Sequence, residues 1–275
     1  MNESIDLTEA RKFLVSLVPQ AGKILKRYFS SGDFTQRNKG GVDFTTQVDE
    51  EVDSFLREQI KKQYFQTNFL TEETAPPDYS LLRDANDLWV IDPLDGTTNF
   101  SRKHSNYAIS IGLVDKGVTK LGVVHIPMTG DTYWTQADKE GAFLNDEIIH
   151  VSTTNNLRES VVGCDWAWDI EKRLNVVRWL GNISTYVRQI KAMGSAVSDL
   201  ASLADGRIDV YIHSGLKPWD VAAISLLIEK AGGKITSPTG LKWDVFQSDI
   251  LATNGIFHDK IIDLLTNGSQ QMHKS

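Results

Sequence analysis

Two aspartates within residues 89–100 offer the clearest chemistry in this sequence. Asp92 and Asp95 stand three residues apart after an apolar run expected to be a strand, and Pro93 fixes the turn between them. Carboxylates that leave one tight turn together can share a cation. Hard oxygen ligands, with no cysteine or clustered histidine nearby, suit Mg²⁺ rather than zinc. The segment therefore predicts a site for a divalent cation.

The same turn is suited to an anion. The Leu94 carbonyl, between the two aspartates, can supply one more oxygen ligand to a cation. Gly96 frees the backbone, and Thr97 and Thr98 can start a helix. The N–H groups of Gly96 and Thr97 would then lie at a helix N-terminus, which favours negative charge. A cation and a phosphate could bind side by side here.

Two further acidic features come from distant parts of the chain. Glu72 and Glu73 end an expected strand, and Asp220 lies in the first turn of an expected helix. Each also has an ordinary structural explanation, a solvated strand end for the glutamates and an acid facing the helix dipole for Asp220. Turn chemistry alone could likewise explain Asp92 and Asp95.

Gathering such carboxylates in one place without a cation is unfavourable. Two like charges about 4 Å apart repel by roughly 4 kcal/mol at the effective dielectric of a protein surface. The groups either acquire raised pKa values or bind metal, and with Mg²⁺ present at neutral pH we expect metal.

Other hydrolytic and nucleotide-binding chemistries lack their motifs. The sequence has no Gly-x-Ser-x-Gly elbow of a serine hydrolase, and the run 231–236 lacks the spacing of a P-loop. The six histidines are scattered, and no metal-ligand spacing joins them. The single cysteine, Cys164, sits in an apolar string and is interpreted as a buried structural thiol.

Composition and charge are those of an ordinary globular protein. The 275 residues are 41% hydrophobic and 24% charged, with a formal net charge of −7 and no basic run, so no nucleic acid partner is expected. A lone cysteine, a polar N-terminus and no apolar run of bilayer length predict a cytoplasmic protein without a membrane partner.

The hydrophobic pattern predicts helices and strands that do not alternate regularly, which favours layered α+β sheets over a barrel. Helices are expected over residues 6–29, with a kink at Pro19, and over 46–64, 171–180, 194–204, 218–231 and 259–266. Strands are expected over residues 69–71, 88–91, 107–114, 121–125, 132–136, 161–164, 208–212 and 250–253. We expect a single unit, 1–275, in two packed halves of about 1–150 and 151–275, with a frayed tail over 267–275.

Four segments, in order, resemble motifs of the inositol monophosphatase family. Residues 92–100 look like its first signature, and residues 219–223 with 229–233 look like its second. Residues 43–49 and 70–74 resemble the family's upstream and acidic segments. The resemblance implies an α-β-α-β-α layered sandwich, usually paired as a homodimer. It also implies a magnesium-dependent, lithium-sensitive phosphatase that uses two or three ions.

The resemblance further implies a role for each matching residue. The metal ligands would be Glu72, Asp92, the Leu94 carbonyl, Asp95 and Asp220, with Asp92 bridging two ions. The residues that position and activate the attacking water would be Asp49, Glu72 and Thr97. The phosphate would be held by Asp95, Gly96, Thr97 and Thr98. The substrate contacts would come from Gly194, Ser195, Ala196, His213 and Asp220.

His213 departs from the family pattern. Inositol-specific members tend to carry a glutamate seven residues before the second-signature aspartate, which is Asp220 in this chain. A histidine can donate, accept or carry charge, or this side chain could simply face solvent. Ser195, by contrast, could be a helix N-cap as well as a substrate contact.

The expected reaction is hydrolysis of a small polyol or sugar phosphate by a metal-activated water, with myo-inositol monophosphate as the first choice of substrate. Histidinol phosphate, fructose 1,6-bisphosphate and 3′-phosphoadenosine phosphate are alternatives within the same superfamily. A metal-binding module that acts through a protein partner is the alternative of another class.

Overall fold

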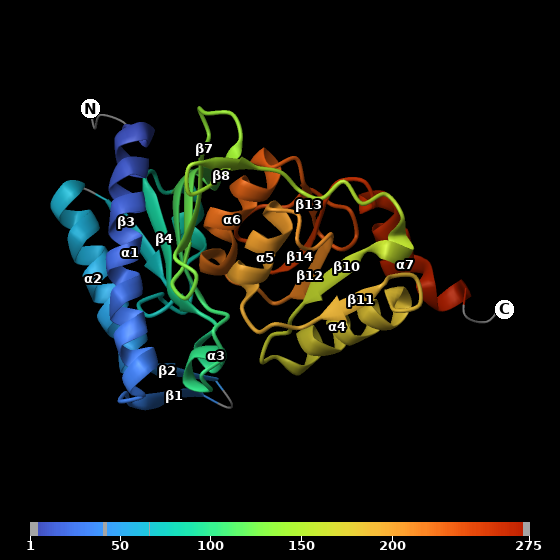
Figure 1. Ribbon diagram of the computed structural model, residues 1–275, viewed down its shortest axis with the longest axis horizontal. Helices are drawn as coiled ribbons and strands as arrows, with labels where there is room; N and C mark the ends of the chain where they lie inside the picture. Colours follow the sequence, from blue (N-terminus) through green and yellow to red (C-terminus); the bar gives the residue numbers. More distant parts are fainter. Residues whose placement is uncertain (1–4, 41–42, 66, 272–275) are drawn as a thin grey trace.

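Alternating layers of helices and sheets make up the protein, which a computed structural model describes over residues 5–40, 43–65 and 67–271 (Figure 1). The first layer consists of α1 (Leu7–Ser31) and α2 (Gln47–Gln63). These two helices cover one face of a seven-stranded sheet, and their apolar side chains share a core with it. Both helices lie close to the ranges predicted for them, because their apolar stripes are strongly periodic.

The remaining helices form the central and the far layers. The central helices α5 (Ala196–Ala204) and α6 (Pro218–Lys230) lie between the seven-stranded sheet and a five-stranded sheet. On the outer face of the second sheet lie α4 (Ile170–Ile183) and α7 (His258–Gln271). The resulting order, α-β-α-β-α, confirms the predicted fold class.

The seven-stranded sheet follows the order of the chain. Its first pair, β3 and β4, is parallel, and every later pair is antiparallel. The strands are β3 (Asn68–Thr71), β4 (Leu88–Asp95), β5 (Ala108–Asp115), β6 (Val118–Ile126), β7 (Asp131–Gln136), β8 (Ala142–Leu144) and β9 (Glu147–Ile149).

The five-stranded sheet has the order β11-β10-β12-β14-β13. Strand β10 is parallel to both of its neighbours, whereas β14 is antiparallel to β12 and β13. The strands are β10 (Val161–Cys164), β11 (Gln189–Lys191), β12 (Val210–Ser214), β13 (Lys234–Thr236) and β14 (Asp249–Thr253).

Short elements complete the chain. A hairpin of β1 (Gln36–Gly40) and β2 (Asp43–Thr46) leads into α2, and the one-and-a-half-turn helix α3 (Thr97–Ser101) follows β4. Two 3₁₀ turns are η1 (Ser80–Asp84) and η2 (Leu157–Glu159). Within the described ranges, none of the helices combines the length and the apolar character that crossing a bilayer requires.

The structure corrects several predicted boundaries. The helix predicted over 194–204 begins only at Ala196, because Gly194 has a positive φ of 80° and Ser195 is the N-cap. The tail predicted to fray from residue 267 is helical up to Gln271, and residues 272–275 lie outside the described part. Helix α1 continues on both sides of Pro19, where the expected kink stays a prediction.

Two glycines let the central helix α6 approach the seven-stranded sheet closely. A Cβ on Gly122 of β6 would lie 2.2 Å from the carbonyl oxygen of Ala223, and one on Gly112 of β5 would lie 2.9 Å from the Cβ of Ala222. No side chain fits at such distances, so the helix backbone rests directly on the sheet. This contact fixes where α6 begins, and therefore where Asp220 in its first turn lies.

We expect Gly122→Ala to lower the free energy of unfolding by about 1–3 kcal/mol, because the added methyl group must push α6 away from β6. Gly181→Ala is the matched control. Gly181 lies inside α4, and a Cβ there would meet nothing within 4 Å, so alanine should stabilise the protein by about 0.5–1 kcal/mol. Urea unfolding followed by circular dichroism measures both changes, and equal effects of the two variants would contradict the close-contact argument.

Candidate active site

The end of β4 presents Asp92 and Asp95 together. The pairing register between β4 and β5 shifts between these two residues, so the strand bulges and both side chains leave it near one place. The Leu94 N–H donates to Asp92 Oδ1 at 3.0 Å, which closes the turn. Asp95 Oδ2 accepts the Val197 N–H at 2.9 Å and the hydroxyl of Ser195, both at the start of α5.

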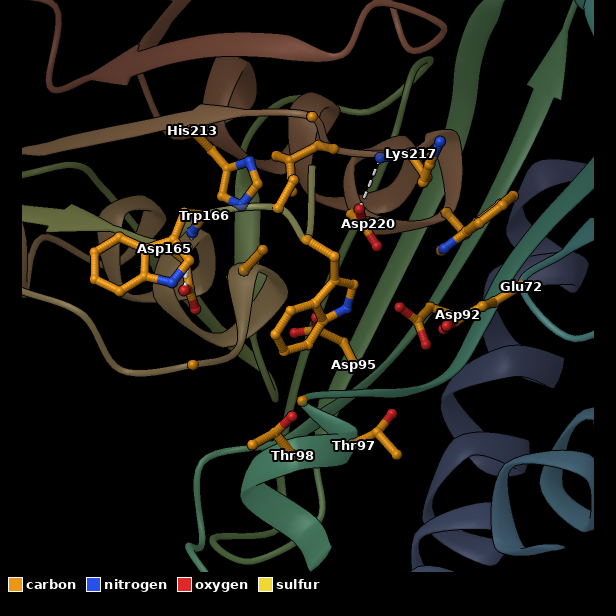
Figure 2. Close-up of a pocket in the computed structure, with 18 of the residues that line it drawn as sticks. Glu72, Asp92, Asp95, Thr97, Thr98, Asp165, Trp166, His213, Lys217 and Asp220 are labelled. Atoms are coloured by element: carbon orange, nitrogen blue, oxygen red, sulfur yellow. Dashed lines mark hydrogen bonds between the residues drawn. The ribbon is translucent and has the colours of Figure 1, made fainter. Parts of the chain in front are cut away.

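Asp220 reaches the same place from the first turn of α6. Pro218 stands at the start of this helix, and the Lys217 N–H donates to Asp220 Oδ2 at 2.7 Å (Figure 2). Asp220 therefore stabilises a helix N-terminus, as its ordinary structural explanation requires. Its carboxylate also lies near the two aspartates of β4, so the structural explanation does not exclude a metal-binding role.

The three aspartates form one carboxylate cluster. One oxygen from each of Asp92, Asp95 and Asp220 lies within 4.8 Å of the other two. Glu72 lines the same pocket, since it directly follows β3 and its N–H donates to the Ile91 carbonyl at 3.2 Å. Glu72 lies beside Asp92 in this pocket (Figure 2). Four acidic residues from three separate parts of the chain therefore share one pocket, as predicted.

Burial makes this cluster electrostatically unfavourable in the absence of a cation. Desolvation raises the pKa of Asp95 to about 7, and the Ser195 and Val197 hydrogen bonds only partly offset it. Desolvation, followed by repulsion from neighbouring carboxylates, also raises the pKa values of Asp92 and Asp220 well above the ordinary range. A divalent cation with oxygen ligands fits this donor set, because its charge removes both penalties.

Asp49 and Thr97 form a second polar pair beside the cluster. The Thr97 hydroxyl lies 3.2 Å from Asp49 Oδ1 and 3.2 Å from the Leu94 carbonyl, but its single proton can serve only one acceptor at a time. Asp49 is held by the Thr46 N–H at 2.9 Å and by the Thr46 hydroxyl. Burial raises the pKa of Asp49 to about 7, so this carboxyl can exchange a proton near neutrality.

The predicted phosphate-contact residues line the pocket as well. Gly96 has a φ of 91°, and a Cβ there would lie 3.1 Å from the Asn106 carbonyl, so this turn requires glycine. Thr97 and Thr98 follow it at the start of α3, next to Asp95. The residues of this turn and the acidic cluster therefore line the same cavity.

Some of the predicted substrate-contact residues line the pocket, and one bonds to Asp95 instead. Gly194 and Ala196 line the pocket, whereas Ser195 is buried and bonds to Asp95 while it caps α5, as its alternative interpretation required. His213, on β12, lines the pocket but is only 5% exposed, so the suggestion that it faces solvent is wrong. Burial lowers its pKa to about 4, which leaves the imidazole uncharged at neutral pH.

The sequence analysis missed one part of the pocket, the loop between β10 and α4. Trp166 and Trp168 in this loop line the cavity, as do Lys172 of α4 and Lys217 before α6. The available signal was two tryptophans flanked by aspartates directly after a predicted strand. Cys164, at the end of that strand, is buried as predicted, and burial raises its pKa to about 12.

Comparison with known proteins shows which family this chain resembles in sequence and fold. The family model for the inositol monophosphatase family matches residues 6–270. A fructose-1,6-bisphosphatase/inositol-1-monophosphatase of Thermotoga maritima is 29% identical, covering 92% of this chain and 94% of the relative. The Nus factor SuhB of Escherichia coli K12 is 32% identical, with 86% and 87% covered. The solved structure of extragenic suppressor protein SuhB from Bartonella henselae has a TM-score of 0.86 at 28% identity, with 94% and 99% covered.

The chain belongs to the inositol monophosphatase family. Family members are metal-dependent phosphatases that act on phosphorylated sugars and polyols, and the carboxylate cluster described above is compatible with metal binding.

We expect Mg²⁺ to raise the melting temperature, and the increment to grow as pH rises. Because burial raises the folded-state pKa of Asp95, the metal-free protein is stabilised while this group is protonated and loses that stability as pH rises through about 7. A bound cation instead favours the ionised form. At a Mg²⁺ concentration about 100 times the Kd, the free energy of unfolding should rise by about 2.7 kcal/mol. Thermal unfolding with Mg²⁺ or EDTA at pH 6 and pH 8 measures the increment.

The comparison uses the rise in melting temperature caused by Mg²⁺ at each pH, because other titrating groups affect the stability equally with and without Mg²⁺. Burial lowers the pKa values of His125, His213 and His258 to about 4, which costs stability as pH falls below about 6.5 whether Mg²⁺ is present or not. Asp92→Asn should abolish most of the increment, whereas Asp259→Asn, which alters an exposed carboxylate of α7, should leave it intact. An increment independent of pH, or one retained in Asp92→Asn, would contradict the assignment.

Proposed function

We propose that this chain is a magnesium-dependent phosphomonoesterase that hydrolyses a small phosphorylated polyol or sugar by direct attack of water. The observation that carries the proposal is the carboxylate cluster of Asp92, Asp95 and Asp220, whose oxygens lie within 4.8 Å of one another beside the Gly96 turn. Such a cluster suits hard cations, and the turn beside it suits a phosphate.

The acidic residues would hold the cation. Glu72, Asp92, Asp95 and Asp220, with the Leu94 carbonyl, offer enough oxygen ligands for the two or three ions that the family resemblance implies. When bound, Mg²⁺ lowers the pKa of an attacking water and stabilises negative charge on the leaving oxygen. The chain's own residues would supply the positioning that this chemistry requires.

Asp49 and Thr97 would handle the proton of the attacking water. A carboxyl whose pKa is about 7 is well matched to accept a proton near neutral pH. Thr97 connects it to the pocket, since its hydroxyl lies 3.2 Å from Asp49 Oδ1. When Asp49 is protonated it can donate to the Thr97 hydroxyl, which can then donate to the Leu94 carbonyl at 3.2 Å.

The backbone at Gly96 and Thr97, with the side chain of Thr98, would hold the phosphate. No nucleophilic side chain is needed, because a metal-activated water would attack the phosphorus. The thiol of Cys164 is in any case buried, with a raised pKa. On this proposal the phosphate passes directly to water and no covalent intermediate forms on the protein.

The leaving group would contact Gly194, Ala196 and His213 beyond the phosphate. The relatives include proteins named inositol monophosphatase and one named fructose-1,6-bisphosphatase/inositol-1-monophosphatase, so myo-inositol monophosphate and fructose 1,6-bisphosphate are the first candidate substrates. Histidinol phosphate and 3′-phosphoadenosine phosphate belong in the same comparison. A homodimer in the cytoplasm, built from two packed halves per chain, stays our prediction for its assembly.

A second candidate function is action through a protein partner. It is favoured by the relatives that are named Nus factor SuhB, which are 32% identical to this chain. The metal site could then be retained for structure. No phosphate release from any ester in the panel below, with a Mg²⁺-dependent partner interaction, would favour this candidate over the phosphatase.

We expect Asp95→Asn to reduce kcat/KM by about 10²-fold or more while the fold stays intact. An amide oxygen can still accept the bonds from Ser195 and Val197, but it lacks the charge that a cation needs. Asp259→Asn, on the exposed surface of α7, is the control and should retain full activity. Near-normal turnover in Asp95→Asn, with unchanged circular dichroism, would refute the metal-ligand assignment.

Phosphate release should require Mg²⁺ and should be inhibited by Li⁺. The measurement is a phosphate-release assay over inositol, fructose, histidinol and nucleotide phosphates, with Mg²⁺ or EDTA and then with increasing LiCl, using NaCl as the control for ionic strength. Full activity in EDTA would exclude the metal-dependent mechanism. Full activity in high LiCl would separate this chain from the lithium-sensitive members of its family.

A further inference from the structure

The cavity extends well beyond the space that a cation and a phosphate fill. Its volume is about 810 Å³, in the upper part of the range of about 300–1,000 Å³ typical of pockets that take drug-sized ligands. Figure 2 places Trp166 and His213 on one side of the pocket, and Glu72 and Asp92 on the other. With a phosphate at the carboxylate cluster, the Trp166 side of the cavity offers room for the leaving group.

Two tryptophans of the pocket lining are exposed. Trp166 is 40% exposed and Trp168 is 47% exposed, and both line the cavity. Both belong to the loop between β10 and α4. The loop begins at Asp165, whose charge acts on the carboxyl of Asp95, so it lies within electrostatic reach of the carboxylate cluster. Large apolar side chains that stay exposed beside a polar site indicate a binding surface.

The tryptophan loop is held in one conformation from within the fold. Arg173 of α4 donates from Nε and Nη2 to the Ala167 carbonyl, both at 3.3 Å, and its guanidinium lies 6.0 Å from the Trp166 ring and 5.9 Å from the Trp168 ring. The two indoles thus lie near one cation, which favours this arrangement of the pair. A ligand would therefore meet indoles that are already partly restrained.

Two more contacts hold the ends and the middle of the loop. Asp169 caps α4 by accepting the Lys172 N–H at 2.9 Å. Gly215, with a φ of 101°, leaves room for the loop, because a Cβ there would lie 2.6 Å from the Cβ of Ala167. The loop is therefore seated against the segment that leads to Asp220, on the rim of the catalytic pocket.

The chemistry of this surface suits a flat aromatic ring better than a hydroxyl-rich one. Each ring hydroxyl of a polyol needs a hydrogen-bond partner, but an indole offers a single N–H donor and no acceptor. Its face instead offers stacking to a planar heterocycle, irrespective of the heterocycle's substituents. His213, across the pocket from Glu72, contributes another ring, which is uncharged because burial lowers its pKa to about 4.

We infer that the substrate's leaving group is a sugar that carries an aromatic heterocycle, as in a nucleoside monophosphate, and that the heterocycle stacks on Trp166 and Trp168. This inference rests on the proposed phosphomonoesterase function and specifies its substrate class. The phosphate binds at the carboxylate cluster, the sugar crosses the middle of the cavity, and the base lies against the two indoles.

The kinetic test compares two substrates that differ only in the base. Adenosine 5′-monophosphate and ribose 5-phosphate share the phosphate and the sugar, so their ratio of kcat/KM isolates the heterocycle. The wild-type protein should prefer the nucleotide by about tenfold or more. Trp166→Ala and Trp168→Ala should each lower this ratio, mainly through KM, and Trp166→Phe should restore most of it.

The control variant is Leu174→Ala. Leu174 lies on α4 and is 53% exposed, like the tryptophans, but it does not line the cavity. This variant should keep the wild-type ratio. A ratio near one in the wild-type protein, or one unaffected by both tryptophan variants, would overturn the inference even if both esters are hydrolysed.

A binding measurement separates failure of this inference from failure of the phosphatase proposal. Adenosine and ribose carry no phosphate, so their binding needs no metal and no turnover. Adenosine should quench the indole fluorescence of the wild-type protein in EDTA, less so in Trp166→Ala, and ribose should not. Quenching without hydrolysis of any ester would support the aromatic subsite and refute the phosphatase. Absence of quenching would overturn the subsite.

The oligomeric state provides the last check. If a second copy of the chain covered the indoles, Trp166→Ala would shift the elution volume of the protein in size-exclusion chromatography while Leu174→Ala would not. That result would assign the tryptophans to a subunit interface and overturn the inference. An unchanged elution volume, with the loss of the nucleotide preference, supports the substrate subsite.

Discussion

Repulsion among one buried and two half-buried carboxylates is the constraint on which the rest of the site depends. Asp92, Asp95 and Asp220 bring oxygens within 4.8 Å of one another where desolvation already raises their pKa values. Among the described residues, the hydrogen bonds to these three carboxylates come from neutral donors, which offset the desolvation of Asp95 only in part. On the proposed function, a bound cation would convert this unfavourable arrangement into a favourable one.

The layered architecture provides the stiffness that this cluster requires. The bulge in β4 fixes two of the carboxylates, and the start of α6 fixes the third. Gly112 and Gly122 allow the backbone of α6 to rest on the sheet, so the distance between these two elements is set by main-chain contact. Side chains that can change rotamer would set it less sharply.

Much of this site could be predicted from the sequence, but the reason differs from residue to residue. Asp92 and Asp95 are close in the chain, so their turn alone predicted a shared role. Glu72 and Asp220 lie far away, and only the family motifs connected them to it. Short elements such as β8, β9 and β13, three residues each, carry too few residues for a recognisable alternation. The tryptophan loop was missed because tryptophan is usually buried, and exposure depends on the tertiary fold.

The division of labour between elements has a consequence for how such enzymes diversify. Every carboxylate of the cluster lies at the end of β4 or in the first turn of α6, whereas the loop between β10 and α4 contributes none of them. On the inference above, exchanging the part of that loop after Asp165 would alter which leaving groups are accepted, while Asp165, whose charge raises the pKa of Asp95, and the carboxylate cluster stay in place. Related proteins could in this way evolve new substrate preferences through a few substitutions in one short segment, while the carboxylate cluster is inherited unchanged.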